Sequence, residues 1–524
     1  MAIPPHPTSA RRIASGVSSL ANCLTAGAVF TFPLWSPLFD RVFKLSTTQL
    51  NLLASAGILG EYVSAASFGQ LADKRGPGAV SFAAAVLFGV GFGLLGWRYQ
   101  VGVETRARGE KTWEHEWMVL AIFYSLTGCA TAASYFSAMI SCTKSAPARH
   151  SGLAIGVPCA VFGLSPLFLS FIASAFTTTS RTADTTGELD AGRYLFFLGA
   201  FLFVVNGVGA ICIKELPWED NLEKVIIDAL EPPLDAGESG FSPSAVPSID
   251  GQGSTERTSL LPPRRPPSPA SPNAEQTLRE LLSTASFWLL GAVVFFSTGP
   301  AEMVMASIGT ILESLVSPGH TPAFPSSSTS PSQALTLRRR HVSALSLANT
   351  VSRLVVGATS DWLATGPTRR PDETRGDAAV PARKAVWRKS IRLWFVGAAC
   401  LLLAVAYGWG GTGLSTPAGL WVVTLVTGTS YGTVFTLTPA LVRTRWGMGS
   451  FGRNWGLLTW FSAAGALLFT PLFGLLRDLA TPSSPEGTCL GPKCYRPIFA
   501  LSAASALIAT GVVVMLGKRW ARRI

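Results

Sequence analysis

The sequence predicts an all-α membrane protein with twelve transmembrane helices in two six-helix halves, and three observations lead to this fold class. Hydrophobic residues make up 48% of the 524 residues and charged residues only 14%, whereas an ordinary soluble domain carries roughly 25% charged residues. The charged residues are clustered, and the apolar stretches between the clusters are about 20 residues long, the length needed to cross a hydrocarbon core of roughly 30 Å. Short motifs also recur at matching places in the two parts of the chain.

Each apolar run is expected to form a helix, because a segment surrounded by lipid must satisfy its own backbone hydrogen bonds. The N-terminal half, 14–213, follows a short tail (1–13) and contains the runs 14–36, 48–70, 78–97, 117–139, 152–176 and 194–213. The C-terminal half, 285–517, precedes a second tail (518–524) and contains the runs 285–312, 341–362, 393–410, 417–438, 454–476 and 497–517. The first run is too long for the core of a signal peptide, so we expect it to remain as a span.

The basic residues predict the orientation in the membrane. If the N-terminus is cytosolic, the segments on the cytosolic side hold 27 of the 42 Lys and Arg residues, and the opposite loops hold 14. This bias predicts that both termini are cytosolic. The triplet Arg338, Arg339 and Arg340 is an exception, since it falls in a loop on the opposite side. The net charge of +12 therefore follows from topology and does not predict a nucleic-acid partner.

A polar segment separates the two halves. Residues 214–284 are rich in Pro, Ser, Gly and charge, and such a composition predicts a disordered cytosolic linker because it cannot bury enough apolar surface to fold. Glu256, Leu260 and Leu261 in this linker match an acidic dileucine sorting signal, Glu-x-x-x-Leu-Leu. The pattern predicts a sorting adaptor as a partner, although short patterns of this kind also arise by chance.

Two motifs repeat between the halves. Gly69-x-x-x-Asp73 ends the second span, and Gly357-x-x-x-Asp361 ends the eighth. Ser-Pro-Leu-Phe at 165–168 in the fifth span corresponds to Thr-Pro-Leu-Phe at 470–473 in the eleventh. The halves therefore align span for span with parallel topology, as expected for repeats related by an axis along the membrane normal.

The stretch from Gly69 to Gly76, Gly-Gln-Leu-Ala-Asp-Lys-Arg-Gly, resembles the signature between spans 2 and 3 of the major facilitator superfamily. Gly69 would let a neighbouring helix approach closely, and Asp73 could bind a helix N-terminus or a basic group. Lys74 and Arg75 would hold the loop at the anionic cytosolic face. Pro77 and Gly78 stand where the signature usually continues with basic residues. The alternative is an ordinary short turn with cytosolic charges.

Span 8 adds a second resemblance. It reads Asn349-Thr-Val-Ser-Arg353 and then Gly357-x-x-x-Asp361, which resembles the monocarboxylate-porter and nodulin-like branch of the superfamily. Some members of that branch carry an acidic residue where Asn349 stands. Phe-Gly-x-Asn-Trp-Gly at 451–456 and Tyr135-Phe136 in span 4 resemble the fungal vacuolar members, which are named as monocarboxylate-transporter homologues. This resemblance implies a vacuolar membrane.

Arg353 is the only Lys or Arg inside a predicted span. A charged residue within a membrane helix is costly and persists where it faces a cavity, a partner or a substrate. Its guanidinium group fits a carboxylate or a phosphate. A structural ion pair, or a side chain that reaches towards the cytosol, explains it equally well.

Further candidates are acidic or polar. Glu61 in span 2 and Glu302 in span 7 could exchange protons during transport, or could simply bond a neighbouring helix. Glu302 follows Gly299-Pro300, which suggests a kinked or broken helix. Polar side chains that could line a cavity, or form ordinary interhelical hydrogen bonds, are Asn22, Tyr62, Tyr135 and Tyr431.

The remaining signals concern chemistry and assembly. Cys489 and Cys494 share a polar loop where a disulfide is plausible, and zinc binding is less plausible because no His or second Cys pair accompanies them. Catalytic and nucleotide-binding motifs are missing from the sequence, so we expect neither an enzyme nor a cofactor. We expect a monomer that moves a small solute, an organic anion with or without a proton, by alternating access. The alternative is a receptor or nutrient sensor with the same fold that does not transport.

Overall fold

The computed structural model describes residues 9–45, 47–109, 113, 115–147, 150–176, 189–216, 277–315, 331–365, 382–480, 489 and 491–522. The prediction that 214–284 is a disordered linker falls mostly on residues outside these ranges. Its last described part begins at Thr277, whose side chain accepts from the backbone of Glu280 while Glu280 bonds back to the backbone of Thr277. This capping box starts the short helix α9 (Leu278–Ser283).

The N-terminal half begins with a helix that is interrupted. The first span comprises α1 (Ser9–Ala26), a 3-10 turn (Gly27–Thr31) and α2 (Phe32–Phe43). The other helices of this half are α3 (Thr47–Arg75), α4 (Pro77–Ala107), α5 (Glu116–Ser145), α6 (Ser151–Ala173) and α7 (Ala191–Cys212). The interruption lies against the Ser-Pro repeat of α6, because the amide of Gly27 donates to Ser165 Oγ at 2.9 Å.

The C-terminal half has the same order. After α9, its helices are α10 (Ala285–Leu315), α11 (Pro331–Thr365), α12 (Ala382–Thr412), α13 (Leu420–Trp446), α14 (Phe451–Ala480) and α15 (Arg496–Ala521). Every predicted span of this half corresponds to one of these helices, each of which is longer than the apolar run that predicts it. The prediction that the Arg triplet lies in a loop is wrong, because α11 begins at Pro331 and includes all three residues.

Eleven of the described helical segments are long and apolar enough to cross a membrane. The twelfth, α11, is long enough at 35 residues but more polar. In its second half several polar side chains are buried, for example Thr350, Arg353 and Asp361, while Leu347 and Val355 are exposed. Because the helix interface takes the polar face and lipid takes the apolar face, α11 completes a twelve-helix bundle.

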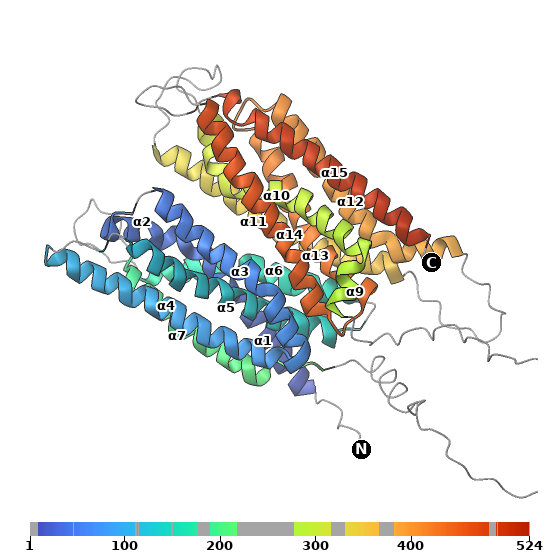
Figure 1. Cartoon of the computed structure of the whole chain (residues 1–524), viewed down its shortest axis with the longest axis horizontal. Coiled ribbons are helices and arrows are strands. Elements are labelled where there is room, and N and C mark those ends of the chain that lie inside the picture. Colours follow the sequence, from blue (N-terminus) through green and yellow to red (C-terminus); the bar gives the residue numbers. More distant parts are fainter. Residues whose placement is uncertain are drawn as a thin grey trace, which may run out of the picture.

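Figure 1 shows the N-terminal half (blue to green) packed beside the C-terminal half (yellow-green to red), with the start of α1 and the end of α15 at the same end of the bundle. The most extensive contacts between the halves are those of α3 with α14 and of α6 with α11. The first pair joins the second span to the eleventh, and the other joins the eighth span to the fifth. The two pairs are therefore equivalent in the two halves, as expected from the repeated motifs. We call the end of the bundle where α3 and α11 terminate the motif end.

Of the two forms predicted at Gly299-Pro300, a kinked or a broken helix, the break does not occur, because α10 continues through Pro300. Proline lacks an N–H, so the carbonyl of Phe296 loses its usual partner. Ser505 of α15 donates to that carbonyl at 2.8 Å. A hydrogen bond from a neighbouring helix thus lets α10 accommodate the proline.

Candidate functional site

A cavity of about 70 Å³ lies between the two halves. The N-terminal half contributes Phe30, Glu61, Tyr62, Ala65, Ala132, Tyr135, Phe136 and Phe162. The C-terminal half contributes Arg353, Tyr431, Phe435, Trp455 and Thr459. The cavity thus collects five of the residues predicted from the sequence, from four different helices: Glu61, Tyr62, Tyr135, Arg353 and Tyr431.

Aromatic rings form most of the cavity wall. Tyr135 packs against Phe162 with ring centroids 5.0 Å apart. Across the cavity, Phe435 packs against Tyr431 at 4.5 Å and against Trp455 at 6.0 Å. Such rings provide a rigid apolar surface, so the few polar groups among them determine which ligand fits.

Arg353 is the cationic group of this wall. It is 4% exposed, and its Nε donates to Asn349 Oδ1 at 2.9 Å. Its guanidinium carbon lies 5.8 Å from the centroid of Phe435, a favourable cation–π distance. Among the described residues, Arg353 forms no ion pair, and its two terminal nitrogens have no hydrogen-bond partner. The predicted structural ion pair is therefore absent from this part of the chain, and two donors remain for a ligand.

Glu302 lies behind the cavity wall and connects the two halves. Its Oε1 accepts hydrogen bonds from Tyr62 at 2.7 Å, from Tyr431 at 3.1 Å and from Ser462 at 2.7 Å. Tyr62 belongs to the N-terminal half, whereas Tyr431 and Ser462 belong to the C-terminal half. Glu302 and Glu61 also interact electrostatically, so two carboxyl groups and one guanidinium group surround the cavity.

At the motif end, α3 terminates against the start of α14. Gly69 and Gly452 are in such close contact that a Cβ on Gly69 would lie 2.1 Å from the carbonyl oxygen of Gly452. Asp73 Oδ2 accepts from the backbone amide of Arg453 at 3.0 Å, and Asp73 Oδ1 lies 3.3 Å from Lys144 Nζ. Asp73 thus binds both a helix N-terminus and a basic group, which satisfies amides that lack a partner in their own helix.

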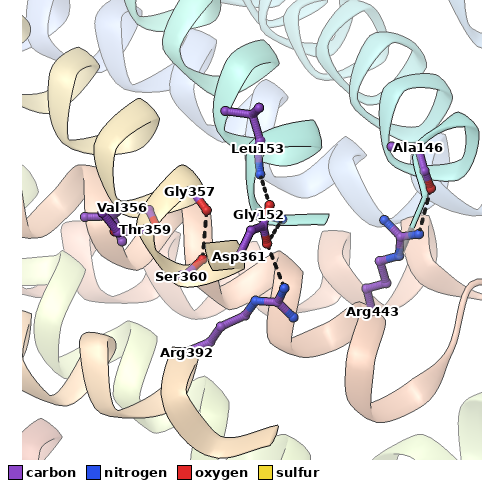
Figure 2. Close-up of polar contacts among 10 residues, drawn as sticks. All are labelled: Ala146, Gly152, Leu153, Val356, Gly357, Thr359, Ser360, Asp361, Arg392 and Arg443. Atoms are coloured by element: carbon purple, nitrogen blue, oxygen red, sulfur yellow. Dashed lines mark hydrogen bonds and ion pairs between the residues drawn. The ribbon is translucent and has the colours of Figure 1, made fainter. Parts of the chain in front are cut away.

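The second motif makes an equivalent contact between α11 and α6. Asp361 accepts from the backbone amides of Gly152 at 2.8 Å and Leu153 at 2.9 Å, and from Arg392 at 2.8 Å. Figure 2 shows these three bonds converging on the one carboxylate. A Cβ on Gly357 would lie 2.8 Å from the carbonyl oxygen of Gly152. Both halves therefore close against each other at the motif end.

The rest of the predicted motif is peripheral. Lys74 and Arg75 are exposed in the last turn of α3. Gly76 follows with φ of 84°, a backbone conformation that glycine adopts readily. These three residues shape the turn into α4, and the inter-half contacts come from Gly69 and Asp73.

The family model described as "Major Facilitator Superfamily" matches residues 17–470. The chain belongs to this superfamily. The "Probable transporter mch1" of Neurospora crassa is 27% identical, with 99% of this chain and 91% of the relative covered. The "Probable transporter MCH1" of Saccharomyces cerevisiae is 24% identical, with coverage of 96% and 91%.

Solved structures of the superfamily share the fold. The proton:xylose symporter XylE superposes with a TM-score of 0.57 at 11% identity, covering 96% of this chain and 95% of that chain. A bacterial homologue of the iron transporter ferroportin, in an outward-facing state, gives a TM-score of 0.57 at 13% identity, with coverage of 97% and 99%. This chain is therefore a multi-pass membrane protein with the major facilitator fold.

Not every predicted residue reaches the cavity of this superfamily member. Asn22 is fully buried inside the N-terminal half, where its Nδ2 donates to Ser81 Oγ at 2.9 Å and to Ser137 Oγ at 3.2 Å. Asn22 therefore forms interhelical hydrogen bonds and does not line the cavity. Tyr135 does line the cavity, and its hydroxyl contacts Cys159 Sγ at 3.1 Å.

Two further predictions concern other parts of the chain. Cys489 and Cys494 form a disulfide with a Cα–Cα distance of 5.8 Å. The sorting signal of Glu256, Leu260 and Leu261 lies outside the described residues.

The sequence did not single out several residues that the structure places at these sites. In the sequence, Lys144 and Arg392 are basic residues between predicted spans, and Ser462 and Phe435 lie inside apolar runs without any charge to mark them. The repeated Gly-x-x-x-Asp motif could have indicated Lys144 and Arg392, because an aspartate buried at each motif requires a nearby cation.

Proposed function

We propose that this superfamily member is a secondary transporter that carries a small organic anion, such as a monocarboxylate, together with a proton across the vacuolar membrane. The proposal depends most on Arg353, a buried cation at the interface of the halves with two nitrogens free of partners among the described residues. A guanidinium group pairs with a carboxylate through two parallel hydrogen bonds. A desolvated charge of this kind is retained in a membrane protein when it serves a ligand.

The size and lining of the cavity favour a small substrate with an apolar body. At about 70 Å³, the cavity has room for only a few heavy atoms before the halves move. Phe162, Phe435 and Trp455 offer apolar faces to such a body, while Arg353 fixes its charged end. The related "Probable transporter mch1" proteins support a transport role.

Glu302 is the residue we propose for proton coupling. As a carboxylate it accepts three hydrogen bonds, one of them from the opposite half through Tyr62. A protonated carboxyl group accepts fewer hydrogen bonds and donates one of its own. Protonation would therefore weaken the connection between the halves and favour the motion that alternating access requires. Glu61, which lines the same cavity, is the second site for that proton.

The proposed location depends on the dileucine pattern at 256–261 and on the resemblance to vacuolar members of the superfamily. With both termini in the cytosol, the motif end would face the cytosol. The contacts of Asp73 and Asp361 would then close the cytosolic entrance.

Flux measured in proteoliposomes tests the transport proposal. A panel of small carboxylates should enter vesicles that contain the wild-type protein, and Arg353→Lys should reduce uptake at least tenfold, since an ammonium group cannot form the bidentate pair. Arg340→Lys, an exposed position on the same helix, is the matched control and should transport normally. Normal uptake by Arg353→Lys would refute the role of Arg353, whereas binding without flux would indicate a receptor.

The pH profile of uptake tests the coupling residue. Glu302→Gln keeps the shape of the side chain but cannot exchange a proton, so uptake should lose its dependence on external pH. Glu61→Gln, measured in parallel, shows which of the two carboxyl groups carries the proton. An unchanged pH profile in Glu302→Gln would remove this residue from the mechanism.

A further inference from the structure

A groove of about 620 Å³ lies where the last turns of α15 pass the first turns of α10. Leu289 of α10 forms one wall. The floor is a single stripe of α15, because its residues recur at spacings of three and four: Gly511, Val514, Met515, Lys518, Arg519 and Arg522. Since α15 forms the outer edge of the C-terminal half (Figure 1), the groove faces away from the bundle interior.

The part of the groove nearer the membrane centre is apolar and open. Val514 is 36% exposed and Met515 is 50% exposed. An added Cβ on Gly511 would meet nothing within 4 Å, so this glycine leaves a notch in the helix surface. These residues lie within the span Arg496–Ala521, where acyl chains surround the protein.

The other end of the groove is basic. Lys518 and Arg522 are exposed, whereas Arg519 is half-buried. The Nε of Arg519 is buried and has no hydrogen-bond partner in the described ranges. None of the three forms an ion pair with a carboxylate of the chain's described part. Three cations therefore meet at one place without an anion to neutralise them.

Tryptophans mark this level as the membrane boundary. Trp288 is exposed at the start of α10, and Trp520 donates from Nε1 to Ser286 Oγ at 3.1 Å. Tryptophan side chains are enriched at the lipid headgroup level. The basic end of the groove thus coincides with the headgroups and its apolar end with the acyl chains.

We propose that this groove is a binding site for an anionic phospholipid. The phosphate of the headgroup binds Lys518, Arg519 and Arg522, and one acyl chain lies along Gly511, Val514 and Met515. Basic pockets between membrane helices bind anionic headgroups in this way. A free phosphate would use the basic end alone and leave the apolar floor without an occupant. The lipid holds α10 against α15, and α10 carries Glu302.

Lipid titration of the full-length protein in neutral detergent tests this site. Phosphatidic acid should bind and raise the melting temperature, whereas phosphatidylcholine with the same acyl chains should not. Each basic residue near an anionic lipid contributes roughly fivefold in affinity, so Lys518→Gln combined with Arg522→Gln should weaken binding about 25-fold. Arg11→Gln combined with Arg279→Gln removes two exposed charges at the same end and should leave binding unchanged.

A second variant tests the apolar part without changing charge. Gly511→Phe fills the notch and should weaken phosphatidic acid binding at least tenfold. Gly207→Phe in α7, where an added Cβ also meets nothing within 4 Å, is the matched control. Equal binding of the two lipids, or unchanged binding in the variants of the groove, would refute the site. Displacement of the lipid by millimolar inorganic phosphate would show that only a phosphate subsite exists.

Discussion

At the motif end, Asp361 and Asp73 bind equivalent helix N-termini in the two halves, but their cations differ. Arg392 donates to Asp361 Oδ1 at 2.8 Å. Lys144 lies 3.3 Å from Asp73 and is shared with Glu215 at 2.9 Å. Asp73 Oδ1 has no hydrogen-bond partner in the described part of the chain. The contact between α6 and α11 is therefore the stronger one electrostatically.

The closeness of backbone packing at Gly69 and Gly357 ranks the two contacts in the opposite order. A Cβ on Gly69 would approach a backbone oxygen to 2.1 Å, whereas one on Gly357 would stay 2.8 Å away. The contact between α3 and α14 thus depends more on close packing and less on charge. The two copies of the motif thus hold the halves together with different proportions of ion pairing and close packing. We therefore expect the two contacts to respond differently to the same substitution.

Asp361→Asn should have the largest effect. It removes a carboxylate that binds a buried Arg392 and two backbone amides, and it leaves that arginine charged without a partner. Breaking a buried pair in this way costs about 3–5 kcal/mol. Thermal unfolding in detergent should show a clear loss of melting temperature. A smaller loss than in Asp73→Asn would contradict the ranking of the two contacts.

Gly69→Ala comes next in size. The new methyl group would overlap the carbonyl of Gly452, and overpacking of this kind costs about 2 kcal/mol. The closed state should therefore become less populated, which can be measured by the labelling rate of a cysteine introduced at the motif end. Gly357→Ala should change that rate less. Gly93→Ala, where space is open, controls for the change in helix propensity.

Asp73→Asn should have the smallest effect of the three. Asn can still accept from the amide of Arg453, and Lys144 retains Glu215 as a partner. We therefore expect a loss of about 1 kcal/mol, close to the net contribution of one ordinary hydrogen bond. The melting temperature measured beside Asp361→Asn tests this. A loss as large as in Asp361→Asn would show that Lys144 has no effective second partner.

Much of the fold could be predicted from the sequence because lipid imposes a length and an apolar composition on each helix. The exception, α11, was still found, since its exposed face remains apolar around Val355 and Leu347. The repeated glycine and aspartate residues predicted the two closures because close approach and buried charge each require a particular residue type. The break at Gly27–Thr31 was not predicted, since an apolar run does not reveal a 3-10 turn.

The site was harder to predict because spacing along one helix does not show which side chains meet across helices. Arg353 and Glu302 were recognised by the cost of burying a charge. Ser462 and Phe435 are common residue types in membrane helices, and only the packing of α13 and α14 gives them a place in the site. Asn22 is the opposite case. Its polar side chain made it a candidate for the cavity, but it forms hydrogen bonds between helices of its own half.

The central claim is that Arg353 recognises the charge of a small carboxylate. The most direct measurement compares uptake of a monocarboxylate and of its neutral amide by proteoliposomes that contain the wild-type protein or Arg353→Gln, which removes the positive charge. We predict that the wild type transports the acid at least tenfold faster than the amide, and that Arg353→Gln loses this preference. Equal transport of acid and amide by the wild type, or an unchanged preference in Arg353→Gln, would contradict the account.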